Sequence, residues 1–230
     1  MMRLKTNGII LARTNYGEAD RIITFLTPDH GKVKVMAKAV RKSKSKLAGG
    51  IELFSISQLS FIIGRGEINT LVSTRMVKHF GNIVKNLDRT NTGYDLIKRL
   101  DRATESAAES AYFQLLEEAF SALDESTIAL DLIQLWFNMQ LLRLGGHSPN
   151  LRTDSRGQKL LQDKKYDFDL SSMSLSPKDD GNFKTEHIKF LRLGFSHNSA
   201  QTLSRINETD AIVRFVQPVI QSMLQTYIRI

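Results

Sequence analysis

The sequence predicts an α+β protein, with a five-stranded barrel over residues 1–80 followed by an all-helical domain over residues 81–230. Two observations lead to this division. Up to about residue 80, short β-branched and aromatic runs alternate with turn residues, whereas beyond it apolar residues recur every three or four positions. The charge changes at the same place: residues 1–80 carry 14 Lys and Arg against 5 acidic residues, and residues 81–230 carry 18 against 19. The net charge of +8 therefore belongs to the first third of the 230-residue chain.

The barrel strands are expected in five short apolar stretches. Turns rich in Gly, Pro and Asn separate these stretches, and five strands in about 80 residues are typical of a small barrel. In the third stretch Lys32 and Lys34 alternate with valines, which places both lysines on one exposed face of the strand. The strands are expected over residues 8–14, 21–27, 32–37, 54–63 and 70–77.

Helical spacing of apolar residues begins beyond the barrel. Residues 128–144 are apolar around most of a helix, which predicts a central, buried helix that Gly145 and Gly146 end. Residues 147–183 are polar, and we expect an irregular excursion there with a hairpin around residues 166–170. The helices are expected over residues 94–100, 111–122, 128–144, 185–195 and 208–228.

Composition and motifs exclude several classes of function. The absence of Cys excludes a disulfide scaffold, a cysteine nucleophile and Cys-ligated zinc, and it fits a cytoplasmic protein. No stretch is long and apolar enough to span a bilayer, and the N-terminus lacks the apolar run of a leader peptide. The five His residues have no metal-ligand spacing, and no phosphate-binding P-loop or nucleophile elbow occurs. We therefore expect a protein that is not an enzyme and that has no cofactor and no metal.

The strongest functional signal is the run of residues 38–46, called the basic segment below. It contains five basic residues and no acidic residue, and it follows the strand that carries Lys32 and Lys34. Clustered cations on a short connector neutralise phosphates and release counterions, which gives affinity for nucleic acid without sequence readout. A solvated basic loop or a nuclear-localisation run is the alternative interpretation. The candidate phosphate-binding residues are Arg13, Arg21, Lys32, Lys34, Lys38, Arg41, Lys42, Lys44 and Lys46.

Aromatic side chains on which bases stack would complete such a surface. Phe25, Phe54 and Phe61 lie in apolar strands, where a place in the core is the more usual one. Tyr16 lies in a turn and is the aromatic residue that we expect to be exposed.

The N-terminal residues resemble the opening of the RecO family, the bacterial recombination mediators. The resemblance covers GIILARTNYGEADRIITFLT over residues 8–27 and HGKVKVMAKAVRKSKSKLAG over residues 30–49, where the family typically has an "HGK…AKG.R..KS.L.G" pattern. Further on, LLRLGGHSPNL over residues 141–151 resembles the family's "LL..lGy.P.L" segment.

The resemblance implies an N-terminal oligonucleotide-binding (OB) barrel followed by a helical domain, in a cytoplasmic, nucleoid-associated protein. It implies binding of single- and double-stranded DNA and annealing of complementary strands. It also implies that RecA is loaded onto strands coated by single-stranded-DNA-binding protein (SSB). RecR is the implied partner, and the acidic C-terminal tail of SSB is implied to dock on the helical domain.

The chain departs from the family at one point. Many members carry a Cys-x-x-Cys-Gly motif after the "P.L" element and a second Cys pair, which together bind structural zinc. Here the first pair falls on Thr153 and Arg156, before Gly157. We therefore expect no zinc, and a flexible excursion over residues 147–183 in place of the family's zinc finger.

The docking site of an acidic, hydrophobic-ended tail needs an apolar pocket rimmed by cations. Trp136 and Arg143, in the helix over residues 128–144, are the candidates for this site, although a lone Trp among helices is also typical of a core. Two alternatives to a DNA mediator stay open. The first is an OB module that binds RNA, and the second is a non-catalytic scaffold whose basic face meets an acidic protein.

Overall fold

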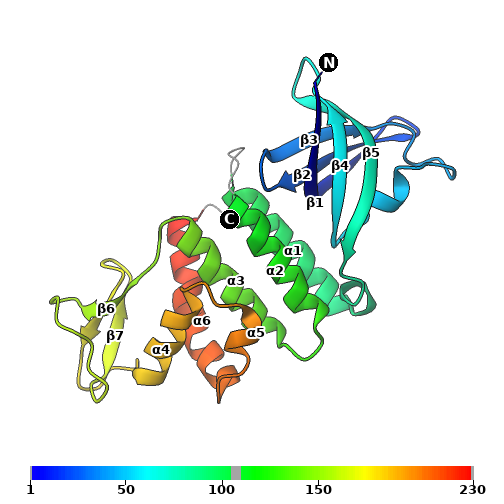
Figure 1. Cartoon of the computed structure of the whole chain (residues 1–230). Helices are drawn as coiled ribbons and strands as arrows, with labels where there is room; N and C mark the ends of the chain where they lie inside the picture. Colours follow the sequence, from blue (N-terminus) through cyan, green and yellow to red (C-terminus); the bar gives the residue numbers. More distant parts are fainter. Residues whose placement is uncertain (1, 105–109, 229–230) are drawn as a thin grey trace. The chain divides into compact units, whose positions relative to one another are not determined.

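The computed structural model describes residues 2–104 and 110–228 of the chain (Figure 1). The chain separates into two compact units, Met1–Asp124 and Glu125–Ile230. The first unit contains a closed barrel and helices α1 and α2, and the second contains helices α3 to α6 and a small sheet. The barrel itself ends at His79, and the first unit extends beyond it because α1 and α2 pack on the barrel.

The barrel has the predicted five strands. β1 is long enough to pair with β4 through its first half and with β2 through its second half, and a bulge between Ile10 and Ala12 marks the change. The strand order is β1-β2-β3-β5-β4, and β3 and β5 are parallel whereas the other pairs are antiparallel. The strands are β1 (Arg3–Tyr16), β2 (Asp20–Thr27), β3 (Gly31–Ala37), β4 (Ser55–Ile62) and β5 (Ile68–His79).

The barrel interior holds the apolar side of each strand. Val33 and Val35 point inward, as their alternation with lysines predicts. Phe25 and Phe61 belong to the same core cluster and are almost fully buried. Phe54 is also buried, so these three aromatic rings are core residues and do not offer faces to a base.

Aromatic packing attaches the helices α1 (Leu87–Ala103) and α2 (Ser110–Asp124) to the barrel. The ring of Phe120, on α2, meets Phe54 and Phe80 edge to face, with centroids 5.3 and 5.5 Å apart. Gly93 lets α1 approach closely, because a Cβ at this position would lie 2.5 Å from the Phe54 ring. The first two helices predicted after residue 80 therefore belong to the same unit as the barrel.

The second unit is built around α3 (Leu130–Leu144), which packs against α6 (Thr209–Tyr227). The predicted burial of this central helix is confirmed by a run of buried residues from Leu135 to Leu142. Two further helices, α4 (Thr185–Gly194) and α5 (Ala200–Leu203), complete the unit. In the described part of the chain, no helix has the length and apolar character needed to cross a membrane.

A three-stranded sheet stands where the sequence analysis expects an irregular excursion. It contains β6 (Asn150–Asp154), β7 (Tyr166–Asp169) and β8 (Ser174–Pro177) in the order β6-β8-β7. β7 and β8 form the hairpin expected around residues 166–170. Tyr166 is 1% exposed and its hydroxyl accepts the backbone N–H of Leu161, so the segment has a small core of its own.

The residues of this segment do not fit the zinc of the family that the sequence resembles. The side chains of Thr153 and Arg156, which replace the first Cys pair, are not zinc ligands. The buried carboxylate of Asp154 accepts the backbone N–H groups of Arg156 and Gln158, each at 2.9 Å, and so closes the turn through hydrogen bonds. Among the residues that the structure describes, no group of three or more His, Asp or Glu could hold a metal ion.

Candidate nucleic-acid interface

The basic segment begins with a sharp turn directly after β3. Ala39 adopts a left-handed backbone conformation (φ 53°), and the family pattern resembled by the sequence has Gly at this position. The Ala39 N–H donates to the Asp20 carboxylate at 2.7 Å, and the Arg41 N–H donates to the Ala19 carbonyl at 3.0 Å. These bonds fix the start of the segment against the turn between β1 and β2.

The far end of the segment is fixed to the barrel as well. Val40 and Ile51 are buried in the barrel core, and the Leu47 carbonyl accepts the hydroxyl of Thr74 on β5 at 3.1 Å. A one-turn 3-10 helix (Ala48–Gly50) follows Leu47. The segment is therefore a connector with both ends attached, which holds its cations at one end of the barrel.

Four lysines of the basic segment point into solvent. They are exposed, and their ammonium groups make no hydrogen bond or ion pair with the described part of the chain. A cation in this state is free to neutralise a phosphate. These residues are Lys38, Lys42, Lys44 and Lys46.

The turn between β1 and β2 adds further predicted residues to this surface. The Arg41 guanidinium donates to the Gly17 carbonyl at 3.2 Å, which places Arg41 beside this turn. Tyr16 is 56% exposed, as expected for a stacking residue. Arg21 donates to the Asn15 side chain at 3.0 Å.

Arg13 belongs to the same end of the barrel. It is exposed, and its guanidinium reaches the Ile51 carbonyl at 3.4 Å. Both Arg13 and Arg21 keep donors beyond these single bonds, because a guanidinium has five N–H groups. The structure thus brings together the predicted residues of the turn and those of the basic segment.

Lys32 differs from its expected place. Its ammonium lies 2.7 Å from the Asp101 carboxylate and donates to the backbone carbonyls of Asp101 and Thr104 at 2.5 and 2.8 Å. Those carbonyls belong to the C-terminal end of α1, where a cation is favourable. Because the side chain is only 17% exposed and its donors are engaged, we leave Lys32 out of the phosphate-binding surface. Lys34 stays in it, since its side chain is 53% exposed and its ion pair with Glu67 is long, at 3.8 Å.

Neither of the two candidates for partner binding in α3 is exposed. Trp136 is 1% exposed, and its indole N–H donates to the Asn198 carbonyl at 2.7 Å, so the core interpretation of this residue holds. Arg143 is half-buried and donates to the Gln140 side chain at 2.9 Å. A buried, internally bonded Trp offers no surface to a peptide.

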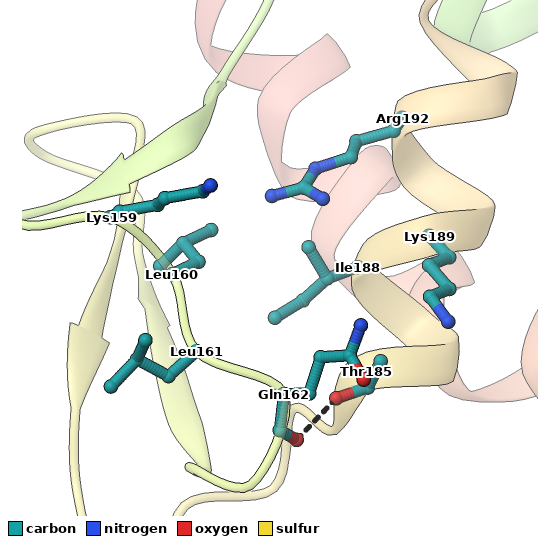
Figure 2. A pocket seen from close by; sticks show the side chains of 8 residues that line it. All are labelled: Lys159, Leu160, Leu161, Gln162, Thr185, Ile188, Lys189 and Arg192. Atoms are coloured by element: carbon teal, nitrogen blue, oxygen red, sulfur yellow. Dashed lines mark hydrogen bonds between the residues drawn. The ribbon is translucent and has the colours of Figure 1, made fainter.

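A cavity that the sequence analysis missed lies between residues 159–162 and α4. Figure 2 shows Lys159 and Arg192 pointing towards each other above the apolar side chains of Leu160 and Ile188. The volume of the cavity is about 150 Å³, and Lys189 adds a third cation to its rim. Leu160 and Ile188 are 9% and 4% exposed, so the floor is apolar and the rim is cationic.

One perturbed titratable group lies on the same helix. Burial lowers the pKa of His187, whose ring stacks on Phe215 with centroids 3.9 Å apart. The nearby Glu186 opposes this shift and Lys184 adds to it. The His187 Nδ1 accepts the backbone N–H of Lys184 at 3.2 Å, which requires the neutral ring.

Comparison with known proteins gives a consistent result over both units. The family model described as "Recombination protein O N terminal" matches residues 1–80, and the model described as "Recombination protein O C terminal" matches residues 96–230. A protein of Dehalococcoides mccartyi named DNA repair protein RecO is 35% identical over 208 residues, which cover 90% of this chain and 79% of that protein.

Other relatives with the same printed name are matched over a smaller part of their length. The protein of a second Dehalococcoides mccartyi strain is 36% identical over 69% of this chain and 62% of its own length. That of a Roseiflexus species is 34% identical over 64% of this chain and 51% of its own length. The chain therefore spans between about half and four fifths of these three relatives.

Proposed function

The chain belongs to the RecO family and has a role in DNA repair, and from this premise we propose that it is a non-catalytic recombination mediator. In this proposal it binds single- and double-stranded DNA in the cytoplasm, at the nucleoid, and anneals complementary strands. It also helps to load RecA onto single strands coated by SSB, together with RecR.

The observation that carries this proposal is the cluster of exposed, unpaired lysines on a connector that is fixed at both ends. No acidic residue occurs between Asp29 and Glu52, so no nearby carboxylate within this stretch competes for the cations. Annealing needs no bond chemistry. It requires that the repulsion between two phosphate backbones is neutralised while the bases stay free to pair.

The proposed contact surface combines the phosphate-binding cations with one stacking residue. If about five cations contact single-stranded phosphates, the logarithm of the affinity should fall with the logarithm of the salt concentration with a slope of roughly −3.5. Tyr16 supplies a ring for one base. The cations are Arg13, Arg21, Lys34, Lys38, Arg41, Lys42, Lys44 and Lys46.

Competition between nucleic acids tests the proposal against its alternatives. We expect a labelled single strand of DNA to bind with this salt dependence, and an RNA strand of the same sequence to compete more weakly. Stronger competition by RNA would favour an RNA-binding module. Absence of binding at 0.05 M salt would favour a protein scaffold and contradict the mediator.

The cavity beside α4 fits the acidic tail of SSB better than Trp136 and Arg143 do. Its floor of Leu160 and Ile188 suits a terminal hydrophobic side chain, and its cationic rim suits the acidic residues before it. Arg192 is held in place by a 2.8 Å hydrogen bond from its Nε to the Leu151 carbonyl.

Titration of a fluorescent acidic peptide that ends in Phe tests this docking site. Lys159→Ala with Lys189→Ala should weaken binding by up to about 30-fold, the upper range for two exposed ion pairs of about 1 kcal/mol each. Lys164→Ala with Lys165→Ala is the matched control, because it removes the same charge from exposed positions outside the cavity. Equal weakening in both variants would show a general charge effect and no docking site.

A further inference from the structure

A second cationic face lies on the barrel, on the strands β1, β4 and β5, which run side by side (Figure 1). We propose that this face binds a second single strand of DNA while the basic segment holds the first. The inference rests on the proposed annealing function and adds to it a surface that neither the basic segment nor the cavity provides.

The core of this face is a row of three polar residues directly opposite one another. Asn7 on β1 pairs with Gln58 on β4, and Gln58 pairs with Arg75 on β5. All three are exposed, and Gln58 is the one exposed residue in β4. Neighbouring strands are about 4.8 Å apart, so the row crosses about 10 Å of the sheet.

Two further cations lie beside the row, and no carboxylate belongs to the three strands. Lys5 and Arg3 precede Asn7 on β1 at every second position, so they share its exposed face of the strand. The Arg3 guanidinium donates to the Ser60 hydroxyl at 2.6 Å. Neither β1, β4 nor β5 contains an Asp or Glu. The exposed charge of these strands is therefore positive throughout, which complements a phosphate backbone.

The amide side chains of the row add groups that fit the edges of unpaired bases. The side chains of Asn7 and Gln58 each carry a donor and an acceptor, and neither side-chain amide has a hydrogen-bond partner in the described part of the chain. Amide side chains form hydrogen bonds with base edges, whereas a surface that contacts only phosphates needs no groups other than cations. The combination favours a single strand, whose base edges are open.

The position of the row separates it from the basic segment. The row lies on the half of β1 that pairs with β4, whereas the turn beside the basic segment follows the half that pairs with β2. Nine positions of β1, with the bulge among them, separate Asn7 from Tyr16 and correspond to at most about 30 Å of extended chain. Two strands can therefore be held on one barrel with their backbones neutralised separately.

Simultaneous capture of two strands tests the inference. Two oligothymidylate strands, which cannot pair with each other, carry a donor and an acceptor fluorophore, and energy transfer between them reports capture of both. Wild type should give energy transfer at 0.15 M salt. Lys5→Gln with Arg75→Gln should weaken binding of the second strand by about 14-fold, the contribution of two phosphate contacts at this salt.

The controls keep the test independent of folding and of the first site. Lys85→Gln with Lys98→Gln removes the same charge from exposed positions of the first unit and should leave energy transfer unchanged. Binding of a single labelled strand at low concentration should be equal in wild type and in the Lys5/Arg75 variant. Thermal melting should also be equal, because both side chains are exposed.

Two results would overturn the inference. In the first, wild type binds one strand tightly but gives no energy transfer. In the second, the Lys5/Arg75 variant gives the same energy transfer as wild type. In both cases DNA binding by the basic segment would still stand. Loss of all strand binding by wild type would instead contradict the proposed function itself.

Discussion

Removal of three lysines from the basic segment should change the salt dependence of DNA binding by a calculable amount. Lys42, Lys44 and Lys46 are exposed, and their ammonium groups make no hydrogen bond or ion pair with the described part of the chain. Their replacement by Gln therefore removes charge and little else. Arg41 is kept, because it holds the turn between β1 and β2 through the Gly17 carbonyl.

The magnitude follows from counterion release. Each phosphate contact of a single strand contributes about 0.7 to the log–log salt slope, so three contacts contribute about 2.1. The affinity of the triple variant should therefore be lower by about 50-fold at 0.15 M salt and by about 500-fold at 0.05 M, and it should approach that of wild type near 1 M.

Fluorescence anisotropy of a labelled single strand, titrated between 0.05 and 0.4 M salt, measures this slope. Lys85→Gln, Lys98→Gln and Arg102→Gln together form the control, since they remove three exposed charges from the region of α1. The control should keep the wild-type slope. A triple variant with the wild-type slope, or a control with an equally reduced slope, would refute the assignment of the basic segment.

Four other changes separate contact residues from structural ones. Tyr16→Ala should weaken single-strand binding by about 1–3 kcal/mol and leave the salt slope unchanged, and equal affinity would show that the ring stacks on no base. Lys32→Met should lower the free energy of unfolding in urea by about 1–3 kcal/mol, because the carbonyls that end α1 lose their donor, and it should not change the salt slope. Asp154→Ala should also lower the free energy of unfolding by about 1–3 kcal/mol, because two backbone N–H groups lose their acceptor. A zinc chelator should leave the melting temperature of wild type unchanged. His187→Phe should reduce the pH dependence of the free energy of unfolding. Because the pKa of His187 is lowered in the folded state, the stability that the neutral ring contributes is complete above about pH 6.5 and is lost as the pH falls through the folded-state pKa.

The barrel could be predicted because its signals are local. Short β-branched stretches, their turn residues and the alternation of lysines with valines each depend on neighbours in sequence, and the same alternation is seen in β3. The basic segment was found for the same reason, since five cations within nine residues are visible without any fold.

Lys32 shows the limit of this reasoning. Alternation correctly assigns Lys32 to the face opposite the valines, but it cannot tell what covers that face. The cover is the end of α1, about 70 residues further along the chain, which meets β3 only after the helices pack on the barrel. A lysine that caps a distant helix and a lysine that binds phosphate are identical in sequence.

The cavity, and the small sheet beyond its predicted hairpin, could not be predicted for a related reason. The floor of the cavity joins Leu160, from a loop, to Ile188, from a helix, and neither residue marks a site alone. In the small sheet, the expected loss of order followed from the absence of Cys. The structure instead closes the same turn with the Asp154 carboxylate, a residue that the family's Cys pattern does not mark.

The most direct test of the mediator proposal is strand annealing with two complementary labelled oligonucleotides, with and without SSB from the same source. We predict that wild type accelerates annealing of bare and of SSB-coated strands, and that the Lys42, Lys44 and Lys46 variant does so far less at 0.15 M salt. Failure of wild type to accelerate annealing, even at low salt, would contradict the account.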